Sequence, residues 1–459
     1  MTRFKDYIAQ RWNTLDDSWR FAITVFIIAR LFYALWSWVI ITIQPIAIQN
    51  FELSGEPIVS IFRLKNSEVY VYHREVNGEV LIFQPLGTEN IIDQQTGTIW
   101  NISNGTAIKG QYKRSNLSSA KTKTSDIFPY FGVKPFPGTL LALWQRFDTN
   151  WYVSIAEHGY GSIPGDDHFP PLYPFLIRIV QPILRNTFLA GLLISHIAIF
   201  ITLKLLYDVF SQWGEKRITK RALIFFAIYP TFFFFFSAYS EPVFLLITLL
   251  AFQAMHVRRW LWAGFWIFCA ILTRLQGVAL LLPMLYLMWK DRSILRMPSY
   301  WIGMFVAGDG GLFYLYLRSI QVTSGAVPFV EADWHARLVP PWETYWYAVR
   351  TILTGNSTFI DVLNWAVMTL VLVLLLWGWK RIPAEYNLYT MFSIFIILIR
   401  IVETQPLISM SRYSLMLFPS FYTLSLAGEN SWFRRAIIYI SILLNLYLSG
   451  QFFIWGWVA

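Results

Sequence analysis

The chain has 459 residues, of which 56% are hydrophobic and 14% charged, and its formal net charge is +10. Soluble domains carry about a quarter charged residues, so this composition excludes an ordinary soluble protein, a disordered chain and a secreted disulfide scaffold. The basic excess is typical of the cytoplasmic loops of a polytopic membrane protein. We therefore predict contacts with membrane lipids and none with nucleic acid.

The first predicted part, residues 1–49, is a charged segment followed by an apolar run at 20–44 that is long enough to cross a membrane. Because that run has spanning length, no cleavable signal peptide is predicted, and the basic residues before it place the N-terminus in the cytoplasm. Arg30, within the run, is expected to pair with an intramembrane acid such as Glu241 or Glu403. The alternative is that Arg30 snorkels to the membrane surface.

Residues 50–137 have a different pattern. Short β-branched and aromatic runs at 58–64, 69–73 and 80–83 predict strands, and Asn77-Gly78 predicts a tight hairpin turn. A Ser/Thr/Lys-rich connector follows. We predict a small β-rich extracytoplasmic insert with its linker in the first external loop.

The third predicted part, residues 138–459, contains the remaining apolar runs. They lie at 187–208, 221–238, 242–257, 299–318, 361–379, 384–402, 412–428 and 435–457. The apolar segment 260–289 is interrupted by polar residues at 273–277, which predicts two short helices that meet where protein or a water-filled cavity covers the backbone. The whole chain then has about eleven spans.

Basic residues in alternate loops orient these spans. The clusters lie at 216–221, 258–259, 290–296, 380–381 and 434–435, and we assign them to the cytoplasm. This assignment requires that the segment 170–184, which holds four prolines and Arg178, does not cross completely and is interfacial or re-entrant. The remaining ionisable residues then gather on the external face, where an active site is expected.

Several short motifs carry a family resemblance. In the stretch 144–160, Asp148 is followed by Trp151-Tyr152, then Ile-Ala and Gly-Tyr. This stretch resembles the first external loop of the GPI mannosyltransferase 2 (PIG-V) family of polytopic glycosyltransferases of the GT-C type. Other blocks in the family's order cover about 144–425, at 169–174, 237–242, 272–277, 328–342 and 409–413. Two departures are Phe147, where the family commonly has Trp, and the β-rich insert.

The resemblance implies an α-helical, GT-C-like polytopic membrane protein and a hexosyltransferase activity. The donor would be a polyprenyl-phosphate sugar, with mannose the first choice, and the acceptor a lipid-linked or surface glycan. The site would face outward from a bacterial plasma membrane. The alternative is a multi-span transporter or flippase for a lipid-linked or small polar solute. Transporters often carry internal repeats with broken helices, and the sequence shows no such duplication.

Asp148 is the predicted catalytic residue, because a carboxylate near the acceptor hydroxyl can take its proton while the anomeric carbon is attacked in one inverting displacement. The alternative is that Asp148 only caps the helix beginning near Trp151. The donor phosphate is expected to bind guanidinium groups, whose planar fork matches phosphate oxygens. The phosphate-binding candidates are Arg274, Arg337 and Arg412.

Further substrate contacts are predicted for aromatic and polar side chains in the same motifs, namely Trp151, Tyr152, His158, Tyr173, Glu241, Trp334 and Tyr413. No cofactor is predicted. A divalent cation held by His158, His168, Asp166 and Asp167 is the less favoured alternative, since these residues lack a firm metal-ligand spacing.

Overall fold

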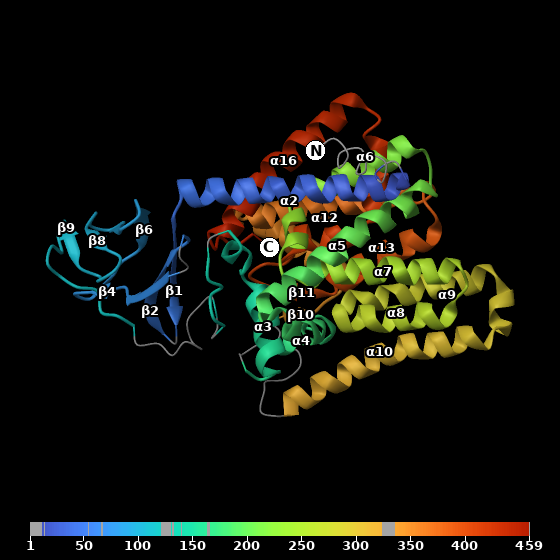
Figure 1. Cartoon of the computed structure of the whole chain (residues 1–459), viewed down its shortest axis with the longest axis horizontal. Coiled ribbons are helices and arrows are strands. Elements are labelled where there is room, and N and C mark those ends of the chain that lie inside the picture. Colours follow the sequence, from blue (N-terminus) through green and yellow to red (C-terminus); the bar gives the residue numbers. More distant parts are fainter. Residues whose placement is uncertain are drawn as a thin grey trace, which may run out of the picture.

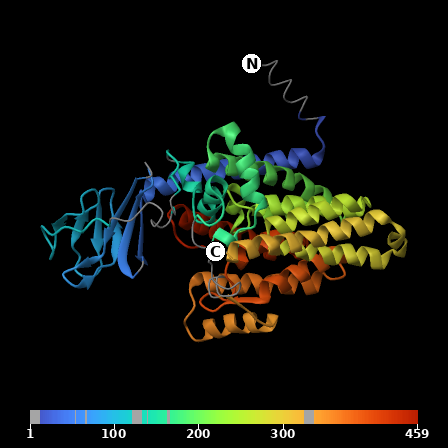
Figure 2. The ribbon, with the colours of Figure 1, turned by 90° about the horizontal axis from the view of Figure 1, so that it is seen from below.

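The computed structural model describes residues 12, 14–53, 55–65, 68–120, 130, 133–138, 140–162, 166–323 and 336–458. Its helices form one bundle, and the strands of the first third of the chain form a β-rich unit at one end of that bundle (Figure 1). A view from below shows the same arrangement, with the β-rich unit beyond the left end of the helices (Figure 2).

Four helices are long and apolar enough, by length and composition, to cross a membrane within the described ranges. They are α2 (Asp17–Ile43), α5 (Thr187–Ser211), α12 (Phe359–Gly378) and α16 (Ser431–Phe453). Shorter apolar helices pack among them: α7 (Glu241–His256), α8 (Trp260–Thr273), α9 (Leu281–Lys290) and α13 (Ala384–Leu398). α10 (Pro298–Thr323) lies alongside α8 and α9 (Figure 1). These lengths fit a membrane protein, and the number of spans stays a prediction.

Two predicted spans are broken in the structure. The run at 221–238 is divided between α6 (Lys216–Ala227) and a 3₁₀ turn at Phe232–Phe236. The run at 412–428 comprises α14 (Met410–Tyr413), a 3₁₀ turn at Ser414–Met416 and α15 (Pro419–Ala427). The interrupted segment 260–289 contains α8, a 3₁₀ turn at Leu275–Leu280 and α9, as its polar centre predicts.

The proline-rich segment forms α4 (Leu172–Leu184), which ends at Arg185 in the left-handed region. Thirteen helical residues reach only about 20 Å at 1.5 Å per residue, which is short of the ~30 Å hydrocarbon core. α4 packs on α5 and on α3 (Asp148–His158), and it leaves Phe175, Ile179 and Ile183 exposed. Its length and its exposed apolar face support the prediction that this segment does not cross completely.

The β-rich unit contains two antiparallel sheets and a hairpin. β1 (Ile46–Leu53), β2 (Glu56–Arg63) and β3 (Glu68–His73) pair in that order. β6 (Phe83–Leu86), β7 (Asn90–Asp93), β8 (Ile99–Asn101) and β9 (Ala107–Lys109) form the second sheet. β4 (Glu75–Val76) and β5 (Glu79–Val80) flank Asn77 and Gly78, whose φ angles of 55° and 82° match a two-residue hairpin turn. The hairpin predicted from Asn77-Gly78 is therefore confirmed.

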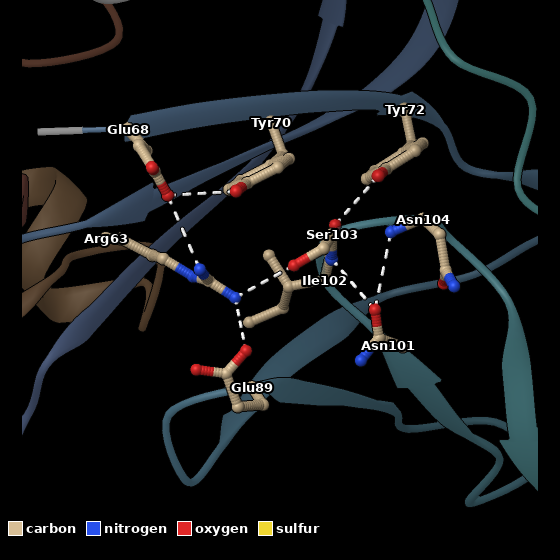
Figure 3. A network of polar contacts seen from close by, with 9 residues as sticks. All are labelled: Arg63, Glu68, Tyr70, Tyr72, Glu89, Asn101, Ile102, Ser103 and Asn104. Atoms are coloured by element: carbon tan, nitrogen blue, oxygen red, sulfur yellow. Dashed lines mark hydrogen bonds and ion pairs between the residues drawn. The ribbon is translucent and has the colours of Figure 1, made fainter. Parts of the chain in front are cut away.

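Arg63, at the end of β2, joins the two sheets (Figure 3). Its guanidinium pairs with Glu89, before β7, and donates to Ser103 Oγ, after β8, at 3.0 Å. Tyr72 of β3 adds a 2.7 Å hydrogen bond to the carbonyl of Ile102. These contacts connect one sheet to turns of the other. They therefore indicate that the two sheets form one folded unit.

Two of the predicted basic clusters lie at the start of α6 and between α7 and α8, at one end of the bundle (Figure 1). Some of their side chains pair with acids at the ends of other helices. Lys216 Nζ lies 2.8 Å from Asp17 Oδ2, and Arg258 Nη2 lies 2.6 Å from Asp291 Oδ2. The β-rich unit and α3 lie toward the other end (Figure 1).

Glycines bring α8 and α10 into close contact. A Cβ at Gly303 of α10 would overlap the backbone of Trp260, whereas a Cβ at Gly308 of the same helix would meet open space. We expect Gly303→Val to lower the unfolding free energy by roughly 3 kcal/mol, since the overlap forces the two helices apart. Thermal unfolding in detergent measures this. Gly308→Val is the control, and equal melting temperatures for the two variants would contradict the predicted packing.

Candidate active site

Asp148 is the first residue of α3, and a bent backbone precedes it. Phe147 adopts φ 46° and ψ −120°, a conformation that costs energy for a residue other than glycine and that is often found at functional sites. Buried Arg146 holds this bend by donating to the carbonyls of Ala142 at 2.9 Å and of Phe453 at 3.0 Å. The bend is thus fixed by a side chain that joins the turn just before it to Phe453, which is 307 positions away in the chain.

The carboxylate of Asp148 points to another helix. Its Oδ2 accepts a hydrogen bond of 2.7 Å from Arg412 Nη1 of α14. The residue before α3 is Phe147, and α3 has no side-chain cap. The alternative prediction, that Asp148 serves as a helix cap, is wrong, because the helix begins at Asp148 itself and the carboxylate is engaged by an arginine.

Glu241 links two arginines behind Asp148. It is fully buried at the start of α7, and its Oε1 lies 3.2 Å from Arg412 Nε and 2.8 Å from Arg274 Nη1. Two guanidinium groups held this close would repel each other, so the buried carboxylate between them offsets that repulsion. Together with Asp148, this set contains two carboxylates and two guanidinium groups, so its formal charges cancel. We call these four residues the charge cluster: Asp148, Glu241, Arg274 and Arg412.

Aromatic side chains enclose the charge cluster. The Tyr413 ring lies 5.0 Å from the guanidinium carbon of Arg274 and 5.4 Å from that of Arg412. Tyr152 donates a 2.8 Å hydrogen bond to Ser240 Oγ, which also accepts one of 3.2 Å from Arg274. These contacts hold both guanidinium groups without occupying all of their donors.

The charge cluster borders a cavity of about 280 Å³. Four arginines line it, Arg274, Arg318, Arg400 and Arg412, whereas Asp148 is the one acidic residue in the described lining. The rest of the lining is largely aromatic and apolar, and includes Phe147, Tyr152, Phe169, Tyr314, Ile396, Tyr413 and Trp457. A cavity with an excess of guanidinium groups and a single carboxylate suits an anionic ligand that reacts beside a base.

Most of the predicted site residues meet at this cavity. Asp148, Tyr152, Arg274, Arg412 and Tyr413 line it, and Glu241 supports the two arginines from behind.

Trp151 and Tyr173 lie one layer further out. Trp151 stacks on Phe169 with ring centroids 5.4 Å apart, and Tyr173 meets Tyr152 edge to face at 4.8 Å. Tyr173 is also buried and hydrogen-bonded to Ser195. These two residues shape the cavity wall through the rings they contact.

Three further predicted residues are not placed at this cavity or next to it. Arg337, on β10 (Ala336–Leu338), pairs with Glu343 at 2.8 Å and with Glu403 at 3.0 Å. His158 is at the exposed end of α3, 3.6 Å from Glu157. Trp334 lies outside the described residues. Arg337 and His158 therefore lie away from the described cavity lining, and their roles stay predictions.

Arg30 has a different partner from the one predicted. Its guanidinium lies 5.4 Å from the centroid of the Trp144 ring. The expected partners are engaged elsewhere, Glu241 by Arg274 and Arg412 and Glu403 by Arg337. The predicted ion pair of Arg30 is wrong, because an indole face takes the place of a carboxylate.

Sequence reasoning missed Arg318, Arg400 and Trp457. Arg318 and Arg400 lie in the last residues of runs that were assigned as spans, 299–318 and 384–402. In the structure α13 ends at Leu398, and Arg400 starts β11 (Arg400–Val402), which pairs with β10. Each of these arginines is at the end of an apolar run that is predicted to be external. That position could have marked both as candidates for the site.

Metal binding has little support in the described side chains. His168 Nδ1 lies 3.1 Å from Asp167 Oδ1, but no three His, Cys, Asp or Glu residues of the described ranges gather as a metal site. A metal-independent reaction stays a prediction.

Part of the chain matches a known protein family. Residues 113–290 match the family described as mannosyltransferase (PIG-V). The resemblance predicted from the motifs is confirmed for this part of the chain, which includes Asp148, Glu241 and Arg274. Arg412 and Tyr413 lie beyond the matched residues, and the structure brings them to the same cavity. No curated protein matches the chain.

Proposed function

From the match of residues 113–290 to the mannosyltransferase (PIG-V) family, we propose that this membrane protein transfers a sugar from a polyprenyl-phosphate donor to a lipid-linked or surface glycan. The family match supports glycosyl transfer, and mannose is the first donor sugar to test. The observation that carries the proposal is the 2.7 Å contact between Asp148 and Arg412 at the edge of an arginine-lined cavity. This contact supports the proposal because it brings a carboxylate next to guanidinium groups, which suit a phosphate anion.

The proposed reaction uses the Asp148 carboxylate as base and the arginines to hold the donor phosphate. The acceptor hydroxyl gives its proton to the Asp148 carboxylate, and its oxygen forms a bond to the anomeric carbon of the donor. The bond between that carbon and the phosphate oxygen breaks, and the polyprenyl phosphate leaves with the bonding electrons. A single displacement of this kind inverts the anomeric configuration and needs no covalent intermediate.

Arg412 has two roles in this scheme. Without substrate it neutralises Asp148 at 2.7 Å. When the donor phosphate enters, the guanidinium can turn its donors to the phosphate oxygens, which frees Asp148 Oδ2 to accept the acceptor proton. Arg274 is held by Glu241 at 2.8 Å and Arg400 lines the same cavity, so both can share the charge of the leaving phosphate.

Charge distribution supports an outward-facing site. The basic turns, which contain Lys216 and Arg258, are at one end of the bundle, and the positive-inside rule assigns that end to the cytoplasm. α3 and the β-rich unit lie toward the opposite end (Figure 1). The proposed topology therefore has a cytoplasmic N-terminus and an extracytoplasmic β-rich unit, with a bacterial plasma membrane as the proposed location.

The proposal is tested with the purified full chain in liposomes. Radiolabelled polyprenyl-phosphate mannose, glucose and galactose are supplied with a lipid and glycan extract, and the nucleotide-linked sugars serve as parallel donors. We expect label to move into the extract from one lipid-phosphate donor and from none of the nucleotide sugars. Transbilayer movement of the labelled donor without transfer would instead favour the flippase alternative.

A further inference from the structure

The residues around Asp148 contact one another in a definite order. Trp457 packs edge to face against Phe147, with ring centroids 5.7 Å apart, and Phe147 directly precedes Asp148. On its other side Asp148 contacts Arg412, and Glu241 links Arg412 to Arg274. An indole and a guanidinium thus lie at opposite ends of one series of contacts, with the proposed base between them.

These two ends suit different substrates. The arginines match a phosphate anion, and so they account for the donor. A base must lie beside the hydroxyl that it deprotonates, so the acceptor belongs on the side of Asp148 away from the phosphate. On that side the described cavity lining contains Phe147, Trp457 and Val458, which present ring and apolar surface.

Trp457 has an accessible ring in the cavity lining. The residue is 44% exposed, whereas Trp455, two residues earlier, is 2% exposed. A sugar ring carries an apolar face of C–H groups, and a large flat aromatic surface can cover such a face while the hydroxyls point elsewhere. The exposed indole offers this surface within the cavity that holds Asp148.

Trp455 holds this part of the chain in place. It adopts φ 65°, and its ring lies 4.4 Å from the Arg146 guanidinium and 5.4 Å from the Phe147 ring. The β-rich unit contacts it from outside, because Gln49 donates a 2.6 Å hydrogen bond to the Trp455 carbonyl and Phe62 packs on its ring at 5.5 Å. Trp457 is therefore presented from a fixed segment, which lowers the entropy cost of binding.

We propose that Trp457 binds the acceptor by covering the apolar face of a sugar ring whose hydroxyl is directed to Asp148. The inference rests on the proposed glycosyl transfer, and it assigns a residue that binds the acceptor. The acceptor is accordingly a carbohydrate with a free hydroxyl, carried on a lipid or a glycan chain.

The test compares kinetic constants of the full-length protein in nanodiscs, with octyl mannoside as acceptor probe and polyprenyl-phosphate mannose as donor. We expect Trp457→Ala to raise the acceptor KM about tenfold, while the donor KM and kcat change less than about twofold. Trp457→Tyr should recover most of the loss because it restores an aromatic face. The control is Trp432→Ala, since Trp432 is exposed on α16 and is absent from the cavity lining.

A second measurement separates this inference from the proposed reaction. Binding of octyl mannoside is measured by calorimetry in Asp148→Asn, with and without Trp457→Ala, and requires no turnover. Weaker binding in the double variant supports the role of Trp457. Unchanged acceptor KM and unchanged binding would overturn it, as would an increase confined to the donor KM. A wild-type protein that binds octyl mannoside through Trp457 but transfers nothing would overturn the proposed function alone.

Discussion

Asp148→Asn is expected to lower kcat for sugar transfer by about a thousandfold while the protein stays folded and membrane-inserted. The amide keeps the size of the side chain and an oxygen that can accept from Arg412, but it cannot take the acceptor proton. The donor KM should change little, because the arginines that line the cavity remain. Initial rates with radiolabelled donor and a melting curve in detergent measure both effects.

Glu157→Gln is the matched control for this substitution. Glu157 is on the same helix, and its Oε2 lies 3.6 Å from His158 at the far end of α3. It is absent from the described cavity lining, so its loss of charge should leave kcat close to wild type. An Asp148→Asn protein with more than about a tenth of wild-type activity would remove Asp148 from the role of base.

Arg412→Lys is expected to weaken the binding of polyprenyl phosphate by about tenfold to a hundredfold. Lysine keeps the positive charge but loses the planar fork, and a charge-assisted hydrogen bond is worth about 1.5–3 kcal/mol. Lysine also suits this test better than alanine. Removing the charge would leave Arg274 alone beside two carboxylates and Asp148 without its partner, at a cost of about 3–5 kcal/mol in stability.

Arg30→Lys provides the comparison for Arg412→Lys. Arg30 lies against the Trp144 ring and does not line the described cavity, so the affinity for polyprenyl phosphate should stay within about twofold of wild type. Equilibrium binding of fluorescent polyprenyl phosphate to each purified variant measures this. Equal affinities for the two variants would show that Arg412 does not hold the phosphate.

Much of the charge cluster could be predicted from the sequence. Asp148, Glu241, Arg274 and Arg412 are ionisable residues in or beside apolar segments, where a charge is costly enough to mark a functional candidate. The basic residues in alternate loops predict that all four lie on one side of the membrane. The sequence did not show that Arg412 contacts Asp148, because that pairing depends on where the fold brings α14 relative to α3.

The errors have physical causes as well. A span is assigned from the mean hydropathy of a whole segment, which does not show where the helix ends within it. For this reason the sequence did not show that Arg400 starts a short strand or that Phe232–Phe236 is a 3₁₀ turn. Arg337 carries the same charge as Arg400 but pairs with exposed carboxylates. Trp457 gave no signal, because indoles near the end of an apolar run are common at membrane surfaces.

The pairing of Asp148 with Arg412 also constrains biosynthesis. These residues are 264 positions apart in the chain. A nascent polypeptide that has reached only α13 contains the carboxylates and Arg274, but it lacks the guanidinium that neutralises Asp148. In the proposed reaction, Asp148 and its arginine partner are therefore both present only after α14 has been synthesised.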